Sequence, residues 1–291
     1  MDSDSKNTIP YTLNHSNASV KFYCHLNEHF GSAIWTNEHD KVKYTQVKHH
    51  TLSLYLEGGY STRRLDQRSA GTGAPNKLCI LPAGHHSDWE IGEQQRFVHL
   101  YFSDSALKRI ALEDFDIDPR RVELPDATYF QDTKLLKNYH RLMSQDWGSP
   151  EQQLALQEKM WEILGDVLIR YAIKPSVKTQ YQGGLSRNII NRLNEYIAAN
   201  ISNKITLDQL ANIAQMSPYH FSRMFKVSTG QTPHQQLMNM RIKKASALLL
   251  NRYSQIETSI ACGFSSQSHF SRAFRNHYGV TPRQFLRAKG L

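Results

Sequence analysis

The sequence predicts an α+β protein with a strand-rich N-terminal half and an all-helical C-terminal half. Two observations support this. The hydrophobic period changes from about two to about 3.6 residues near Lys134, and the last third of the chain contains a helical repeat. A length of 291 residues suits two domains. We expect them over residues 1–173 and 186–291, with residues 174–185 as a polar, helix-breaking linker.

Short extended segments characterise residues 20–104. Leucines that alternate with polar residues over 51–57 predict a half-buried strand, which ends at a Gly-Gly pair. The apolar runs at 78–81 and 97–102 predict two more strands. Short strands separated by Gly, Pro and Asn turns indicate a sandwich or small barrel.

Two amphipathic helices are predicted next, one from about Lys134 to Met143 and one after Pro150. Their apolar stripes could pack on the β domain or on the same helices of a second subunit, and the sequence leaves both alternatives open. The residues that would dimerise the chain in the second case are Met160, Trp161, Leu164, Val167, Leu168 and Tyr171.

The composition excludes several protein classes. Hydrophobic residues make up 40% and charged residues 21% of the chain, which argues against disorder and fibrous repeats. No apolar run approaches the ~18–20 residues that span a bilayer. The polar N-terminus does not resemble a signal peptide, and three widely spaced cysteines argue against a disulfide framework. We expect a cytoplasmic protein with no membrane partner.

The formal net charge of +9 is unevenly distributed. Residues 186–291 contain 14 basic and three acidic residues, a charge of +11, whereas residues 1–185 carry −2. A basic segment joined to a near-neutral one indicates that the C-terminal part binds a polyanion and that the N-terminal part does something else.

An internal repeat lies in the basic segment. The run His220–Lys226 (HFSRMFK) recurs 49 residues later as His269–Arg275 (HFSRAFR), and G-x-T-P recurs at the same offset, at 230–233 and 279–282. Each copy starts at a helix N-cap signal and follows another short amphipathic helix. Each unit is therefore predicted to be a helix-turn-helix.

In such a unit the second helix enters the major groove of DNA. Phe221, Phe225, Phe270 and Phe274 are four residues apart within each copy and should face the core. Gln, His and Arg can read base edges, whereas Lys and Ser suit phosphates. The predicted exposed, DNA-binding residues of the two helices are Tyr219, His220, Ser222, Arg223, Lys226, Gln267, Ser268, His269, Ser271, Arg272 and Arg275.

A connecting helix is predicted from Pro233 to Leu250, with a length of roughly 27 Å at 1.5 Å per residue. Adjacent major-groove faces on one side of B-DNA lie about 34 Å apart, so one chain could present both helices to double-stranded DNA. Arg241, Lys243 and Lys244 on the connecting helix are predicted phosphate contacts.

Residues 186–291 resemble the AraC/XylS family of bacterial transcription regulators. The resemblance rests on Gly263-Phe264-Ser265-Ser266-Gln267-Ser268-His269-Phe270-Ser271-Arg272-x-Phe274-Arg275, followed by Gly279-x-Thr281-Pro282 and Phe285-Leu286-Arg287. One departure is that Ile260-Ala261 precedes Gly263 by a single residue, where the family usually has three. This puts the packing of the preceding helix in question. The resemblance implies a regulator of promoter DNA, commonly an activator, with RNA polymerase as a further partner.

The resemblance also implies a cupin-like β-barrel that binds a small effector, followed by helices that form a homodimer. The stretch Leu81–His86 and the strand at 97–102 look like the corresponding part of such barrels. The candidate effector contacts are Tyr55, His86, Trp89 and His99, with Arg63 and Arg64 as anchors for an anionic group.

Two other functions compete with this one. A metal-dependent cupin enzyme would use histidines and an aspartate from His49, His50, His85, His86, Asp88 and His99, but His85 and His86 are consecutive and would point to opposite faces of a strand. We therefore expect no metal, no cofactor and no enzymatic activity. A constitutive DNA binder without an effector is the other alternative.

Overall fold

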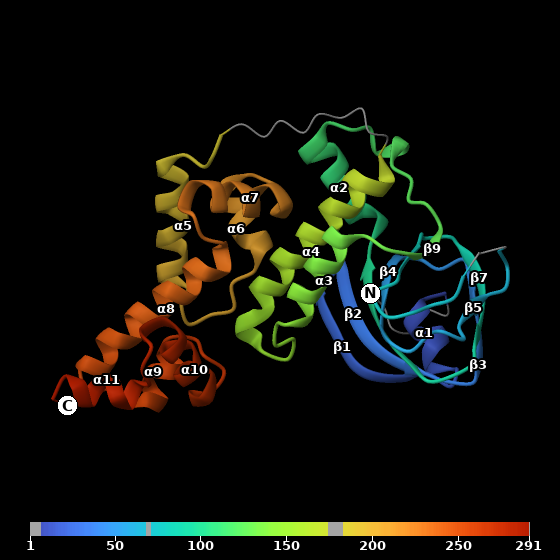
Figure 1. Cartoon of the computed structure of the whole chain (residues 1–291). Coiled ribbons are helices and arrows are strands. Elements are labelled where there is room, and N and C mark those ends of the chain that lie inside the picture. Colours follow the sequence, from blue (N-terminus) through green and yellow to red (C-terminus); the bar gives the residue numbers. More distant parts are fainter. Residues whose placement is uncertain (1–6, 68–70, 174–182, 291) are drawn as a thin grey trace. The chain divides into compact units, whose positions relative to one another are not determined.

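The computed structural model describes residues 7–67, 71–173 and 183–290 (Figure 1). The chain divides into two compact units. Unit 1 comprises Met1–Met143 and Glu162–Thr179, and unit 2 comprises Ser144–Trp161 and Gln180–Leu291. Residues 144–161, which the predicted boundaries assign to the N-terminal domain, are thus grouped with the C-terminal helices. Most of the predicted linker lies outside the described residues.

Unit 1 is built on two antiparallel sheets. Their strands are β1 (Ser19–Asn27), β2 (Phe30–Asn37), β3 (Asp40–Thr45), β4 (His50–Glu57), β5 (Arg63–Arg64), β6 (Leu78–Leu81), β7 (His86–Ile91), β8 (Gln95–Phe102) and β9 (Ala127–Phe130). The larger sheet has the order β1-β2-β8-β4-β6-β9, and the smaller has the order β3-β7-β5. The three strands expected from the sequence are β4, β6 and β8, and they are direct neighbours in the larger sheet.

Strand β4 is buried on both faces, whereas its leucine alternation predicts one exposed face. Its first six residues are all buried because β4 pairs with β8 on one side and β6 on the other, and both faces are covered. On one face Tyr55 belongs to a core that draws on both sheets. On the other, the hydroxyl of Tyr139 donates to the Leu52 carbonyl at 2.5 Å, so helix α3 covers this side. The cupin-like barrel stays a prediction.

Helices complete unit 1. They are α1 (Ile9–Asn14), α2 (Asp104–Phe115), the 3₁₀ helix η1 (Pro119–Arg121), α3 (Thr133–Met143) and the π-helix η3 (Leu168–Ala172). The 3₁₀ helix η2 (Pro150–Gln152) and helix α4 (Gln153–Val167) follow α3, and α4 runs from unit 2 into unit 1. None of the described helices is long and apolar enough to cross a bilayer.

The predicted dimerisation stripe is not available to a second chain. Met160, Trp161, Leu164, Val167 and Leu168 are each at most 2% exposed, and only Tyr171 is partly accessible. Tyr171 donates to Asp132 at 2.7 Å. Periodicity identified the apolar stripe correctly, but the chain itself covers it, so assigning these residues to a dimer contact was wrong.

The rest of unit 2 is helical, coloured yellow to red in Figure 1. Its helices are α5 (Arg187–Ala199), α6 (Leu207–Ala214), α7 (Pro218–Thr229), α8 (Pro233–Leu250), α9 (Gln255–Ala261), α10 (Gln267–Tyr278) and α11 (Pro282–Ala288). Helix α8 has the predicted bounds of the connecting helix. It lies in the chain between two helix pairs, α6–α7 and α9–α10, each with a short turn.

Helix caps explain why the elements of unit 2 begin and end where they do. The hydroxyls of Ser217 and Ser266 accept from backbone amides at the starts of α7 and α10. Thr232 and Thr281 form capping boxes at the starts of α8 and α11. Helices α7 and α10 both end at a glycine of the repeat, at a φ of 72° and 76° respectively, a conformation that suits glycine.

Candidate nucleic-acid interface

The two candidate reading helices are α7 and α10, and their inner faces are as predicted. Phe221, Phe225, Phe270 and Phe274 are all 0% exposed. The two rings of each helix pack against each other at an angle, with centroids 5.6 Å apart in both copies. These contacts fix the rotation of each helix and so determine which side chains face outward.

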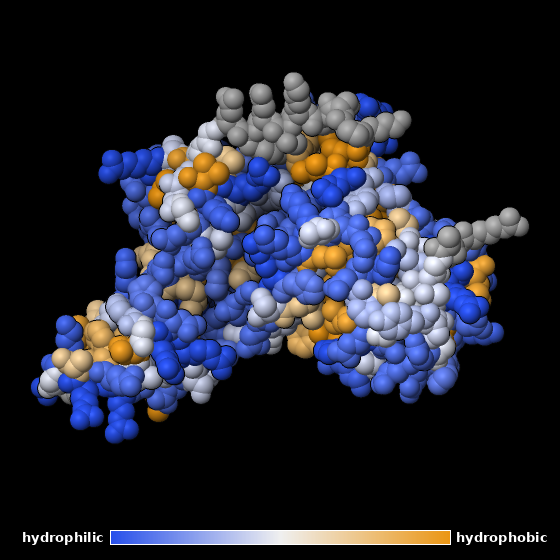
Figure 2. Space-filling model, in the orientation of Figure 1, coloured by the Kyte–Doolittle hydropathy of each residue, from blue (hydrophilic) through white to orange (hydrophobic). Residues whose placement is uncertain are grey.

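Helix α10 presents a polar outer face. Gln267, Ser268, Arg272 and Arg275 are exposed, and Ser271 is half-buried. Gln267 is held by a 3.3 Å hydrogen bond from its Nε2 to Oε1 of Gln255 in α9. The space-filling view shows a largely hydrophilic surface over the C-terminal helices, interrupted by small apolar patches (Figure 2). This face combines amide, hydroxyl and guanidinium groups, which suit base edges and phosphates.

Helix α7 presents a smaller outer face than predicted. Arg223 and Lys226 are exposed, and His220 and Ser222 are half-buried. Burial, followed by the charge of Arg223, lowers the pKa of His220. The predicted exposure of Tyr219 was wrong, because Tyr219 is only 4% exposed. Its hydroxyl accepts from Nη1 of Arg223 at 3.1 Å, so an aromatic body is buried while its polar tip is bonded.

Helix α8 carries three predicted phosphate contacts, and one of them is misplaced. Arg241 is 3% exposed. Its Nε donates to the Ile201 carbonyl and its Nη2 to the Asn203 carbonyl, both at 3.0 Å, so it joins α8 to the loop after α5. Lys243 is exposed, and Nζ of Lys244 donates to the Ala261 carbonyl at the end of α9. Arg241 is therefore a structural residue in this fold.

His269 on α10 lies among side chains that come from a distant part of the chain. Its Nδ1 is 3.2 Å from Oε2 of Glu151, and its Nε2 is 3.5 Å from Oδ2 of Asp146. Ser149 Oγ is also 3.2 Å from Nδ1. These residues lie more than 100 positions before α10, and no motif or period links them to it. Sequence reasoning therefore missed them.

Unit 1 contains a small cavity of about 40 Å³. Three of the predicted effector contacts, Tyr55, Trp89 and His99, line it. The lining also includes Leu13, Asn37, Val42, Tyr44, Ser53, Thr62, Cys79, Leu81, Ile91, Gln95 and Phe97. Burial and then the nearby His49 lower the pKa of His99 to about 3, so the ring is neutral at pH 7. The lining contains no Lys, Arg, Asp or Glu side chain.

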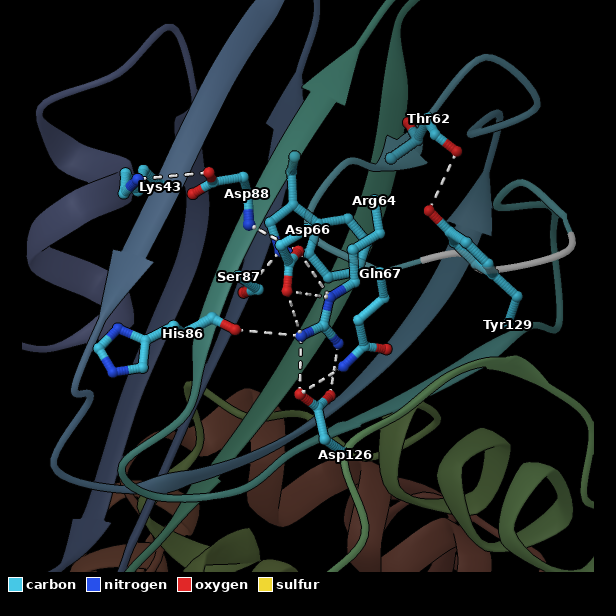
Figure 3. A network of polar contacts seen from close by, with 11 residues as sticks. Lys43, Thr62, Arg64, Asp66, Gln67, His86, Ser87, Asp88, Asp126 and Tyr129 are labelled. Carbon is cyan, nitrogen blue, oxygen red and sulfur yellow. Dashed lines mark hydrogen bonds and ion pairs between the residues drawn. The ribbon is translucent and has the colours of Figure 1, made fainter.

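The other three predicted effector contacts do not line this cavity. Arg63 and His86 are exposed, at the β5–β7 part of the smaller sheet. Arg64 is buried and fully engaged, as Figure 3 shows. Its Nε donates to Asp66 at 3.0 Å, its Nη2 donates to Asp126 at 2.7 Å, and Nη2 also bonds the His86 carbonyl. Because two carboxylates already neutralise Arg64, its assignment as an anchor for an anionic effector was wrong.

The candidate metal-binding residues are dispersed among separate contacts. His50 bonds Asp104 and the Ala83 amide, and His85 bonds the Pro82 carbonyl. Asp88 pairs with Lys43 at 3.3 Å. Across the described part of the chain, no group of three or more His, Cys, Asp or Glu side chains could hold a metal ion.

Known proteins with similar sequences are transcription regulators. A family model described as a helix-turn-helix domain matches residues 210–288. The probable transcriptional regulator LumQ of Photobacterium leiognathi is 35% identical over 94 residues, which cover 32% of this chain and 38% of that protein. The HTH-type transcriptional regulator CdhR of Pseudomonas aeruginosa is 29% identical over 177 residues, 60% of this chain and 50% of that protein. The chain therefore spans about half or less of these relatives' length.

A solved structure is similar to about a third of the chain. It is a transcriptional regulator of Chromobacterium violaceum described as AraC-type, 31% identical, with 34% of this chain and 89% of that chain covered and a TM-score of 0.33. The matched proteins are described as regulators, and the residues matched by the family model contain both copies of the repeat. Residues 210–288 therefore match a helix-turn-helix domain of transcription regulators, in agreement with the resemblance of this segment to the AraC/XylS family.

Proposed function

We propose that the chain is a sequence-specific DNA-binding transcription regulator, most simply an activator, that reads double-stranded promoter DNA with α7 and α10. The observation that carries the proposal is the pair of equivalent helices in one unit, each with buried phenylalanines inside and Arg, Ser and His outside. The charge of +11 over residues 186–291 supplies attraction to DNA phosphates.

The proposed division of labour separates base readers from phosphate contacts. Gln267, Ser268, Ser271, Arg272 and Arg275 would face one major-groove segment. His220, Ser222, Arg223 and Lys226 would face the next, and Lys243 and Lys244 would contact the phosphates between them. Helix α8 has 18 residues and is roughly 27 Å long, which is comparable to one turn of B-DNA.

Unit 1 is proposed to bind a small-molecule effector in its cavity, near Tyr55, Trp89 and His99. A homodimer and a contact with RNA polymerase complete the proposal, on the basis of the family alone. Because the stripe on α4 is covered by its own chain, a homodimer would use a different surface.

One observation favours a second candidate, a DNA binder that needs no effector. A cavity of about 40 Å³ holds only about one or a few water molecules, so a metabolite would require core side chains to move. A thermal-shift screen of metabolites separates the two functions. A ligand that stabilises the wild type but not a Ser53→Phe variant, which fills the cavity, supports an effector, whereas no stabilising ligand across the screen supports constitutive binding.

Substitutions test the DNA-reading assignment. Arg272→Ala or Gln267→Ala should cost about 1–3 kcal/mol of binding free energy and relax preference at particular base pairs. Lys243→Ala should weaken binding to all duplexes alike and lower the salt slope by about 1. Fluorescence anisotropy with a matched panel of single-base variants measures both effects. Equal losses on every duplex for all three variants would contradict the assignment.

A further inference from the structure

A nine-residue segment of unit 2, residues 144–152, reaches the turn that precedes α10, and we refer to it as the acidic strap. Its Glu151 accepts a short hydrogen bond from the Ser265 backbone amide, next to the N-cap of α10. The Ser265 hydroxyl donates to the same carboxylate at 3.0 Å. Within the strap, the Ser149 hydroxyl donates to it at 2.6 Å. One carboxylate thus collects three donors at the start of a candidate reading helix.

Glu151 is held as a buried anion. The residue is 6% exposed. Burial alone would raise its pKa, but the hydrogen bonds from Ser149 and Ser265 lower it to about 2. The start of an α-helix carries a partial positive charge, which favours an anion at this point. Glu151 therefore remains negatively charged at the N-terminal turn of α10 at neutral pH.

The strap is anchored on other helices of the same unit. The His234 amide at the start of α8 donates to Oε1 of Glu158 at 2.7 Å. His234 Nε2 lies 3.1 Å from the Glu151 carbonyl oxygen. The Leu207 amide at the start of α6 donates to Gln157 at 2.9 Å. The strap and the first turns of α4 are thus bonded to the starts of both α6 and α8, so the placement of Glu151 does not depend on a single contact.

The strap also forms one wall of a cavity of about 510 Å³ beside α10. Asp146, Ser149 and Glu151 line it from the strap, and Arg272 and Asn276 line it from α10. Arg272, like Gln267, is a residue proposed to read a base. The two strap carboxylates therefore border the same hollow as a proposed base reader, where a DNA phosphate backbone would meet their negative charge.

Backbone amides at helix starts and serine hydroxyls are also the groups that hold DNA phosphates. We propose that the acidic strap is an autoinhibitory element, in which Glu151 occupies the place of a DNA phosphate at the start of α10 and Asp146 repels DNA beside it. The proposal rests on the proposed DNA-reading function of α10. DNA and the strap compete for Ser265 and His269, so release of the strap increases DNA affinity.

Helix α4 connects the acidic strap covalently to unit 1. Its first residues continue the strap, and its last residues, Glu162–Val167, belong to unit 1. There Asp166 accepts from Lys134 at 2.5 Å and from Asn138 at 2.8 Å. An effector that changes the position of α4 in unit 1 would change the hold of the strap on α10, which is a coupling between two sites through one element.

The test compares full-length variants on a duplex that the wild type binds specifically. Glu151→Gln replaces the anion with an amide, whose NH₂ group cannot accept from the Ser265 donors. It should tighten binding at least about fivefold, the lower end of typical coupling between sites. Asp146→Asn, at a half-exposed residue, should tighten binding less. Glu195→Gln is the control, because it removes one exposed carboxylate from α5 with the same change in net charge.

Hydrogen exchange of the wild type provides the second measurement and does not depend on the folding of any variant. Amides of residues 144–152 should exchange faster when DNA is bound. Glu151→Gln binding equal to or weaker than that of the control, or a strap more protected with DNA, would overturn the autoinhibitory assignment. A wild type that prefers no duplex at all would instead overturn the proposed DNA-reading function, so the two failures are distinguishable.

Discussion

The two helix pairs of unit 2 have nearly the same reading helix but very different supporting helices. Helix α6 buries Leu207, Leu210, Ala211 and Ala214, an apolar stripe at helical spacing. The buried residues of α9 are Thr258 and Ser259. The two copies of the repeat are similar in sequence, but α6 buries an apolar stripe whereas α9 buries two small polar side chains.

The difference is a rotation of the apolar face of α9. Through the 49-residue repeat, Ile256 and Ile260 correspond to the buried Leu207 and Ala211, yet they are 59% and 67% exposed. The hydroxyl of Thr258 is buried and has no hydrogen-bond partner among the described residues. The exposure of Ile260 agrees with the spacing in the sequence, where Ile260-Ala261 precedes Gly263 by one residue instead of the usual three. The α9–α10 pair consequently depends on contacts from outside it, such as the Arg241 guanidinium, which lies 5.9 Å from the centroid of the Phe264 ring, and the Glu151 carboxylate.

The largest expected effect comes from removing a core ring in each pair. Phe221→Ala and Phe270→Ala should each cost about 3–5 kcal/mol of unfolding free energy, because both rings are fully buried. With little apolar support from α9, Phe270→Ala should also open α9 and α10 locally. Chemical denaturation and hydrogen exchange of each helix measure these effects. Unchanged amide protection in α9 and α10 of Phe270→Ala would show that the second pair is better supported than we infer.

A smaller effect is expected from the outside support that Arg241 provides. Arg241→Met should cost about 2–3 kcal/mol, because it leaves the Ile201 and Asn203 carbonyls without their charged donor. Lys243→Met, on the exposed side of the same helix, should change stability by less than about 0.5 kcal/mol while weakening DNA binding. Thermal unfolding and DNA titration of both variants check this. The reverse pattern would restore Arg241 as a phosphate contact.

The smallest expected effect on stability comes from removing one buried hydroxyl, that of Thr258 in α9. Thr258→Val keeps the shape of the side chain and removes its unpaired buried oxygen, so it should stabilise the protein by about 1 kcal/mol. Thr229 is the matched control, because its hydroxyl lies 2.8 Å from the Phe225 carbonyl oxygen and accepts from the Gln231 amide. Thr229→Val should therefore destabilise by about 1 kcal/mol. Denaturant midpoints of the two variants shifting in the same direction would contradict this account.

Much of the architecture follows from local patterns. The change of period, the cap signals and the repeat predict the strands β4, β6 and β8, the bounds of α8, and the inward direction of the four phenylalanines. These features depend on neighbours within about four residues, which a single sequence contains. The charge asymmetry likewise indicates which half of the chain binds a polyanion.

The wrong predictions about individual side chains share one physical cause. The environment of each side chain depends on residues far away in the chain. Arg241 is buried because carbonyls from the loop after α5 accept hydrogen bonds from its guanidinium, and Arg64 is neutralised by Asp126, 62 residues later. Tyr219 is a milder case, with an aromatic ring that the fold covers. Charge in the sequence indicates solvent or ligand contact only when no tertiary partner intervenes, and the contact of Glu151 with α10 is likewise invisible to periodicity.

The most direct test of the central claim is selection of binding sites from a random pool of duplex DNA with the full-length wild type. We predict a bipartite sequence whose two halves lie about one helical turn apart, roughly 10 base pairs between centres. Arg223→Ala should then degrade one half and Arg272→Ala the other. No enriched sequence, or two substitutions that degrade the same bases, would contradict the assignment of α7 and α10 as separate readers.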